Sequence, residues 1–223
     1  MKITPRNVRI FVLAALLAAF TPIGRASTTI YTNGPTNGNF SATGINNGNQ
    51  TEDSFTISVP SILSAVTFGN WVTGGDQALA IDWAIVPSEG SQTPVCNTCS
   101  GTANLSGVND FNNGLAEVSE QTFSLPSITL SPGTYWLELQ NELLSEGDAA
   151  YWDINGGPSM SWDNSTGDLS GDCNVSPSGS CSNAFTVYGT TSASATPEPA
   201  SLALLGSALT VLAAKIRRRT SRL

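Results

Sequence analysis

Residues 78–86 read ALAIDWAIV, a stretch in which apolar and polar positions alternate with a period of two. Four apolar side chains share one face of such an extended chain: Leu79, Ile81, Trp83 and Ile85. Asp82 lies on the other face. Alternation of this kind is typical of a half-buried β-strand. The stretch therefore predicts a strand whose odd-numbered side chains face a core.

The same period recurs on both sides of this stretch. The apolar positions that alternate with polar ones are Phe55, Ile57 and Val59, then Ile62, Val66 and Phe68, then Tyr135, Leu137 and Leu139. A further short strand is expected at 184–189, AFTVYG. The sequence contains no long amphipathic helix between these stretches, so the pattern favours strands throughout.

Five Asn-Gly dipeptides punctuate the chain, at Asn33, Asn37, Asn47, Asn113 and Asn155. Both residues tolerate a positive φ, so these dipeptides mark hairpins or loops. Many short strands separated by Gly and Pro turns predict an all-β fold, an antiparallel β-sandwich of jelly-roll-like type.

The first residues have the layout of a secretory signal peptide. Three basic residues precede an apolar run at 10–20, and Gly24 and Ala26 form a small-x-small cleavage site. The alternative is a permanent N-terminal anchor, but this run is well short of the ~20 residues that a spanning helix needs. The expected segments are a signal peptide at 1–26, a β-sandwich body at 27–189, a flexible linker at 190–196 and a C-terminal segment at 197–223.

Charge is divided sharply along the chain. All nine basic residues lie in the two end segments, and no Lys, Arg or His occurs between Ser27 and Ala214. All seventeen acidic residues fall in that middle part, so the net charge of −8 combines about −17 there with +9 at the ends. Such a body repels phosphate backbones, which argues against nucleic acid as a partner.

Two explanations of this acidity remain open. It keeps an exported protein soluble, or the carboxylates gather a divalent cation such as calcium. The calcium candidates are Asp163, Asp168 and Asp172 in DNSTGDLSGD, whose spacing is not that of an EF-hand. We favour solubility and expect no cofactor, with calcium as the one candidate.

Four cysteines form two close pairs, Cys96 with Cys99 and Cys173 with Cys181. Four cysteines allow three pairings, and sequence alone does not choose among them. Both pairs lie in stretches rich in Gly, Ser, Asn and Pro, which favours two local disulfides over a redox CxxC motif or a zinc site.

The end of the chain has three ordered parts. Residues 196–219 read TPEPASLALLGSALTVLAAKIRRR, in which Pro-Glu-Pro precedes an apolar run and a basic cluster. This order resembles the PEP-CTERM sorting signal. The resemblance implies recognition at Pro197, Glu198 and Pro199 by an exosortase-type enzyme in a Gram-negative-type cell, and traffic to an exopolysaccharide-rich surface or matrix.

The apolar run also predicts a topology. A helix over 200–214 is ~22 Å long, short for a ~30 Å hydrocarbon core, which suits a temporary inner-membrane anchor. The basic cluster is expected to stay cytoplasmic, with the body outside; its members are Lys215, Arg217, Arg218 and Arg219. The alternative is a permanent single-span anchor.

The body also resembles the bodies of other proteins that carry this sorting signal. The resemblance lies in PGTYWLELQN (132–141) and YWDINGGPS (151–159), and it implies no activity. Asp82, Glu138 and Asp153 each follow or precede a tryptophan, as in sugar sites. The candidate glycan contacts are Trp136, Trp152 and Trp162, and Trp136 is expected to be more accessible than Trp83.

Catalysis has little support in the sequence. Serine-nucleophile chemistry lacks a histidine and a G-x-S-x-G motif. Glycoside hydrolysis needs only two carboxylates, but strands commonly carry an acid on the wet face beside a core tryptophan. We therefore expect a non-catalytic, acidic surface or matrix protein that binds glycan. The alternative is a glycan-active enzyme on a jelly-roll scaffold with paired carboxylates.

Overall fold

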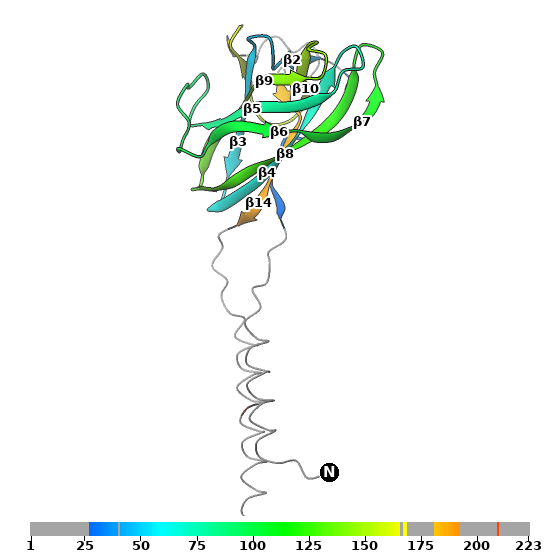
Figure 1. Cartoon of the computed structure of the whole chain (residues 1–223). Helices are drawn as coiled ribbons and strands as arrows, with labels where there is room; N and C mark the ends of the chain where they lie inside the picture. The colour runs from blue at the N-terminus through cyan, green and yellow to red at the C-terminus, as the bar shows by residue number, and fades with distance from the viewer. Residues whose placement is uncertain (1–26, 40, 166, 169–180, 192–208, 210–223) are drawn as a thin grey trace, which may run out of the picture. The chain divides into compact units, whose positions relative to one another are not determined.

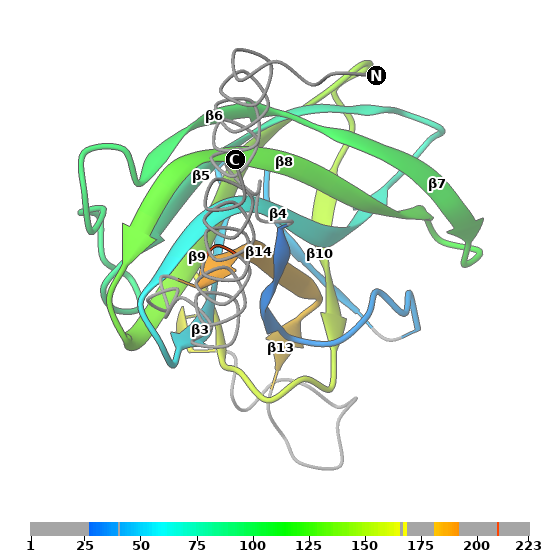
Figure 2. The same ribbon diagram turned by 90° about the horizontal axis from the view of Figure 1, so that it is seen from below.

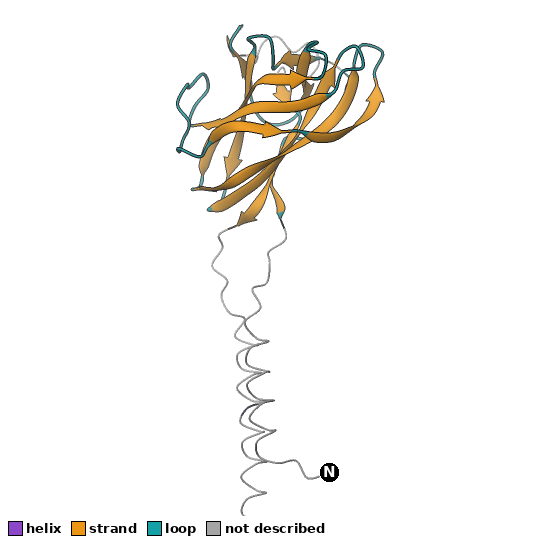
Figure 3. Ribbon diagram, viewed as in Figure 1, coloured by secondary structure: helices purple, strands orange, loops and turns teal. Residues whose placement is uncertain are grey.

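The computed structural model describes residues 27–39, 41–165, 167–168, 181–191 and 209. The chain divides into two compact units, Met1–Thr191 and Ser192–Leu223. Every strand in the described residues belongs to the first unit (Figure 3). Several predicted features lie outside the described residues, namely the signal peptide, Asp172, Cys173 and all of the sorting segment except Leu209. Within the part that the structure describes, no helix is long and apolar enough to cross a membrane.

Fourteen strands make up the described part of the first unit. They are β1 Thr28–Thr32, β2 Ala42–Gly44, β3 Gln50–Ile57, β4 Ser61–Val72, β5 Ala78–Val86, β6 Ser100–Asn104, β7 Ser106–Asn112, β8 Glu117–Leu130, β9 Gly133–Leu144, β10 Ala150–Asn155, β11 Ser161–Asp163, β12 Gly167–Asp168, β13 Ser182–Asn183 and β14 Phe185–Thr191. The last strand runs two residues past the expected end of the body.

The strands form two antiparallel sheets that pack face to face (Figure 1). The six-stranded sheet has the order β12-β11-β3-β9-β5-β6. The eight-stranded sheet follows β1-β14-β4-β10-β13, with β8 on the other side of β4, β7 beside β8, and β2 beside β10. Strands β1 and β14 pair, so the first and last strands of the body are neighbours (Figure 2). The predicted all-β antiparallel sandwich is confirmed.

The core between the sheets is apolar and rich in aromatic rings. Phe68 and Phe185 each pack edge-on against Trp152, with ring centroids 6.3 and 5.5 Å apart. Phe55 of the opposite sheet meets Phe185 at 6.4 Å. Contacts of this kind join the two sheets, and truncating one such ring to Ala typically costs ~3–5 kcal/mol of stability.

Leu79 is not on the core face, contrary to the alternation in 78–86. Its side chain is 43% exposed, whereas the other three apolar residues of that face are buried: Ile81, Trp83 and Ile85. The register between β5 and β9 shifts between Ala78 and Ala80, which marks a β-bulge. The extra residue interrupts the alternation, so Leu79 turns toward solvent.

A second bulge corrects the prediction for Ile62. The register of β4 against β8 shifts between Leu63 and Ala65. Leu63 is therefore fully buried, while Ile62 is 36% exposed. Val59, also expected in the core, is 44% exposed because β3 ends at Ile57.

Four of the five Asn-Gly dipeptides lie in connections between strands, as predicted, and the fifth begins at Asn155, the last residue of β10. Asn113-Gly114 joins β7 to β8 as a tight hairpin, in which Asn113 Oδ1 accepts hydrogen bonds from the backbone N–H groups of Leu115 and Ala116, both at 2.9 Å. Gly114 has φ +90°, a conformation that glycine adopts without strain.

One of the two expected local disulfides is present in the described residues. Cys96 and Cys99 are bonded to each other, with their Cα atoms 5.0 Å apart. Cys181 is also in a disulfide, and Cys173, the other half of the expected second pair, lies outside the described residues. The 96–99 bridge closes a short loop at the end of the long connection from β5 to β6.

Candidate functional site

Two of the three tryptophans expected to contact glycan lie on one face of the six-stranded sheet. Trp136 on β9 is paired with Ser54 on β3, and Trp162 on β11 is paired with Glu52 on β3. Paired residues, and residues two apart along a strand, point to the same side of a sheet. The core residue Phe55 points to the other side, so both indoles lie on the outer face, where each is half-buried. We call this surface the tryptophan face.

Trp136 is more accessible than Trp83, as the sequence predicted. Trp83 is 4% exposed and belongs to the core. Two strand spacings of ~4.8 Å and two residues of ~3.4 Å separate Trp136 from Trp162, which places them about 12 Å apart. A short run of sugar rings spans such a distance.

Trp152 does not belong to this face, and its prediction as a glycan contact is wrong. The side chain is fully buried between the sheets, and its Nε1 donates a hydrogen bond to Ala184 O at 2.9 Å. β10 lies in the eight-stranded sheet with this residue on the inner side. Trp152 is therefore a core residue whose polar atom is satisfied by the backbone.

Two carboxylates lie between these half-buried tryptophans. Glu52 is directly opposite Glu138 on the neighbouring strand, and residues so placed have Cβ atoms ~4.5–5.5 Å apart. Glu52 accepts hydrogen bonds from Gln50 Nε2 at 3.0 Å and Gly90 N at 2.9 Å, and Glu138 accepts one from Gln140 Nε2 at 2.8 Å. The amides hold the two acids side by side.

This pair is closed to solvent. Glu52 is 0% exposed and Glu138 is 5% exposed. Burial raises the pKa of Glu52 to about 7, with a further increase from the charge of Glu138, whose own pKa is also raised by burial. Near neutral pH Glu52 is therefore partly protonated.

The connection from β5 to β6 covers the pair. Gly90 donates to Glu52 and lies against Trp162, since a Cβ added at Gly90 would be 3.4 Å from Trp162 Cζ2. The Cys96–Cys99 disulfide lies at the end of this connection, just before β6. Ile85 N on β5 donates a hydrogen bond to Cys99 O at 2.8 Å. The tryptophan face thus has two half-buried indoles and keeps its acids beneath a loop.

The other two acids that neighbour a tryptophan lie elsewhere. Asp82 is half-buried and accepts hydrogen bonds from Thr102 and Asn141. Asp153 is fully buried on the far sheet, where it accepts from Trp71 Nε1 at 2.6 Å and from the backbone N–H groups of Asn37 and Gly38 at 2.8 and 3.1 Å. Asp153 therefore fixes the 37–38 segment and is no partner of Glu138.

The calcium candidates are only partly described. Asp163 Oδ1 accepts hydrogen bonds from Ser165 N and Ser165 Oγ, both at 2.7 Å, which is an ordinary turn. The backbone of Asp168 pairs with Trp162. In the part of the chain that the structure describes, no group of three or more His, Cys, Asp and Glu side chains could hold a metal ion.

A buried network centred on Asp53 was not foreseen. Its carboxylate accepts hydrogen bonds from Ser159 Oγ, from the backbone N–H of Asn183, and from Asn33 Nδ2 at 3.3 Å. Burial raises the pKa of Asp53 well above its ordinary value, although these hydrogen bonds oppose the shift. The network ties β3 to three segments that are distant in sequence.

A second buried polar pair spans the core. Asn70 on β4 donates through Nδ2 to Glu142 Oε1 on β9 at 2.6 Å. Within the described residues, Asn70 Oδ1 and Glu142 Oε2 are the buried side-chain atoms without a hydrogen-bond partner. Burial raises the pKa of Glu142 to about 8, and the charge of Asp76 adds to the shift.

Comparison of the chain with protein-family models, with curated proteins and with solved structures finds no match. The sequence did not single out Glu52, Asp53 or Glu142, because their environment depends on strands that pair across long separations. The one local signal was the alternation in 50–57, which places Glu52 on the face opposite to Phe55.

Proposed function

We propose that the protein is a non-catalytic, exported surface or matrix protein whose β-sandwich body binds polysaccharide. The observation that carries this proposal is the pair of half-buried indoles, Trp136 and Trp162, on one outer face about 12 Å apart. Aromatic side chains supply a large, rigid contact area at low entropic cost. Eight of the thirteen connections between consecutive strands cross from one sheet to the other, which supports a jelly-roll-like topology as part of the proposal.

Charge narrows the class of polysaccharide. No basic side chain occurs between Ser27 and Ala214, so the body has nothing to pair with carboxylate or sulfate groups on a sugar. An acidic body repels such polymers. The proposed ligand is therefore a neutral or cationic glycan chain.

Truncation of either indole is expected to weaken glycan binding without unfolding the body. Trp136→Ala or Trp162→Ala should lower the affinity for the producer's own extracellular polysaccharide roughly three- to tenfold, which is the loss of one aromatic contact of ~0.5–1.5 kcal/mol. The measurement is retardation in native gels that contain the polysaccharide.

Leu115→Ala is the matched control, because Leu115 is 81% exposed at the β7–β8 hairpin of the other sheet. This variant should migrate like the parent. Unfolding of the tryptophan variants, with no separate loss of retention, would show that Trp136 and Trp162 are structural and would count against the proposal.

Sorting is the second part of the proposal. The tail resembles a PEP-CTERM signal, so we propose an inner-membrane precursor that an exosortase-type enzyme cleaves near Pro197–Pro199. Changing Glu198 to Ala should leave insertion intact, since insertion depends on the apolar run and the arginines. The uncut precursor should then accumulate in the membrane fraction.

The measurement is the mass and fractionation of an epitope placed in the 190–196 linker, in the producing organism. Deleting residues 200–223 is the opposite test and should yield a soluble body with no anchored stage. If the Glu198→Ala protein is trimmed and released like the parent, the tail is an ordinary anchor and the sorting proposal fails.

A glycan-active enzyme is the second candidate, and one observation favours it. Glu52 and Glu138 are directly opposite each other on β3 and β9, and retaining glycosidases use a pair of carboxyl groups ~5–5.5 Å apart. Their burial under the β5–β6 connection argues for binding instead, because a substrate cannot reach them. Release of reducing sugar by the parent, and its loss in Glu138→Gln, would favour the enzyme.

A further inference from the structure

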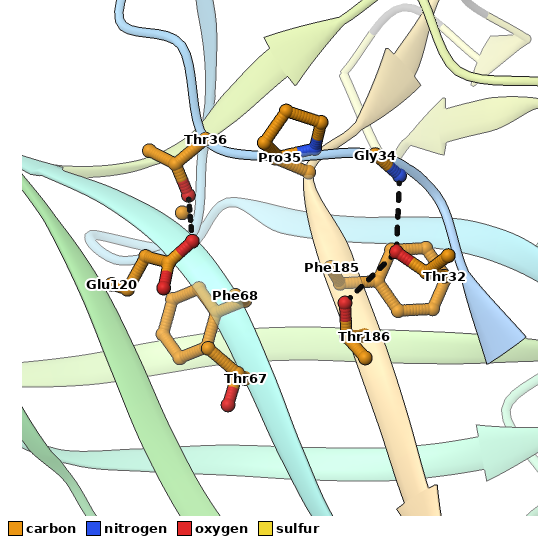
Figure 4. Close-up of a pocket in the computed structure, with 11 residues that line it drawn as sticks. Thr32, Gly34, Pro35, Thr36, Thr67, Phe68, Glu120, Phe185 and Thr186 are labelled. Atoms are coloured by element: carbon orange, nitrogen blue, oxygen red, sulfur yellow. Dashed lines mark hydrogen bonds between the residues drawn. The ribbon is translucent and has the colours of Figure 1, made fainter. Parts of the chain in front are cut away.

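A hollow lies on the outer face of the eight-stranded sheet, opposite to the tryptophan face. It has a volume of about 370 Å³ and is open to solvent where the 34–36 segment crosses β14 and β4 (Figure 4). The side chains that line it include Thr32, Pro35, Thr36, Thr67, Glu120 and Thr186. We call it the threonine pocket. Its volume is at the small end of the range for ligand sites, which suits a single sugar ring.

The overhanging segment is held in place by buried groups. Asp153 accepts hydrogen bonds from the backbone of Asn37 and Gly38, and Asn155 Nδ2 donates to Asn33 O at 2.8 Å. Gly69 forms the floor, and a Cβ there would lie 2.7 Å from Thr36 Oγ1. Only glycine allows so close an approach, so the pocket is built into the fold.

A row of hydroxyl groups leads across the sheet through this pocket. Five residues are paired directly from strand to strand, namely Thr32 on β1, Thr186 on β14, Thr67 on β4, Thr122 on β8 and Ser106 on β7. At ~4.8 Å per strand the row is about 19 Å long. One sugar ring of an extended glycan advances by about the same distance as one strand spacing, so successive rings meet successive hydroxyls.

The hydroxyls of the row retain capacity for a ligand. Thr67 and Thr122 share one hydrogen bond of 2.8 Å, and Thr32 and Thr186 share one of 3.0 Å. A hydroxyl has one donor and two acceptor positions. The Thr67–Thr122 pair therefore still has one hydrogen atom and three lone pairs to offer to sugar hydroxyls.

The charge of the pocket restricts its ligand. Glu120 is the one ionisable side chain that lines it, and its Oε1 accepts a hydrogen bond from Thr36 Oγ1 at 3.5 Å. A carboxylate accepts from two neighbouring hydroxyls of a sugar, and Pro35 supplies an apolar ring. With no cation in the pocket, a phosphate, sulfate or uronate has no partner there.

On the basis of the glycan binding proposed for the tryptophan face, we propose that the threonine pocket is a second, independent site for a neutral glycan chain. The body then holds one chain on each side of the sandwich and cross-links the polysaccharide. The threonine pocket lies on the eight-stranded sheet, whereas Trp136 and Trp162 lie on the six-stranded sheet.

Substitutions in the pocket provide the test, with the producer's extracellular polysaccharide as the probe. Thr67→Val should weaken retention in affinity gels about fivefold, because it removes a hydroxyl group with little change of shape. Glu120→Gln should weaken it about tenfold, because it removes the charge and replaces one acceptor oxygen by an amide donor. Thr129→Val is the matched control, since Thr129 is an exposed threonine of the same sheet, paired with Ile62 outside the pocket. It should bind like the parent. Polygalacturonate should be retained by none of these proteins.

Cross-linking separates this inference from the function on which it rests. The parent should make the polysaccharide solution turbid, whereas Thr67→Val, Glu120→Gln and Trp136→Ala should each bind with less turbidity. Pocket variants that bind and cross-link like the parent would overturn the second site and leave the tryptophan face standing. A parent that binds no polysaccharide would overturn both. If the pocket variants lose polysaccharide binding and Trp136→Ala does not, the result would support the threonine pocket as the glycan site in place of the tryptophan face.

Discussion

Glu142→Gln is expected to flatten the dependence of stability on pH between about pH 5 and 8. In the parent, Glu142 has a pKa of about 8 in the folded protein and an ordinary carboxyl pKa of 4.5 when unfolded. The folded state therefore keeps a proton that the unfolded state loses as pH rises through this window. The contribution of Glu142 to the free energy of unfolding is fully present below the pKa of the unfolded state. It falls by about 3–5 kcal/mol by pH 8.

The geometry explains why glutamine suits this position. A proton on Glu142 Oε2 supplies the donor that Asn70 Oδ1 lacks, beside the existing bond from Asn70 Nδ2 to Glu142 Oε1. Glutamine offers the same acceptor and a permanent donor. The variant should match the parent near pH 4.5 and exceed its free energy of unfolding at pH 8, as measured by urea denaturation at both pH values.

Other buried acids shift stability in the same direction. Burial raises the pKa values of Glu52, Asp53, Glu138 and Asp153 as well. Asp76 opposes them, because hydrogen bonds from Ser145 and from three backbone N–H groups outweigh its burial and lower its pKa. Its contribution is lost only as the solution becomes strongly acidic. A stability maximum near pH 4–5 follows, and a maximum at pH 7–8 would contradict this account.

Asp53→Ala is expected to destabilise the body strongly. It leaves donors on Ser159, Asn183 and Asn33 without their acceptor in a fully buried site. Each unpaired buried donor costs ~1–3 kcal/mol, so a total loss of about 3–5 kcal/mol is expected.

The control for this change is Asp82→Ala. Asp82 also accepts two side-chain hydrogen bonds, but it is half-buried, so water can replace the lost acceptor. Its loss should cost less than about 1 kcal/mol. Thermal and urea unfolding of both variants measure the difference, and equal stability of the two would show that the Asp53 network is dispensable.

The strands were predictable from the sequence because alternation is a local property. Phe55, Ile57, Leu137 and Leu139 face the core as their spacing predicts. The prediction for Leu79 was wrong because a β-bulge depends on the partner strand, and a local sequence pattern contains no information about that strand. Pairing partners decide such details.

The candidate site was less predictable for the same reason. Trp136 and Trp162 share a face only because β3 lies between β9 and β11 with Ser54 and Glu52 as their partners. Trp152 has the same acidic neighbour pattern but lies on the inner side of the other sheet. The sequence analysis also made no prediction for Asp53, which is fully buried in a body without basic side chains.

The place of β14 has a mechanical consequence. This strand lies between β1 and β4 and is antiparallel to both, with Thr28 opposite Gly189 at the end where the chain leaves the body. If the proposed glycan sites hold the body in place, a pull on Thr191 would shear β14 and load its hydrogen bonds to β4 all at once. A pull between Thr28 and Thr191 would instead peel the bonds apart one after another. In single-molecule force measurements, we expect the body to resist tension between its C-terminal strand and a bound polymer better than tension between its two ends.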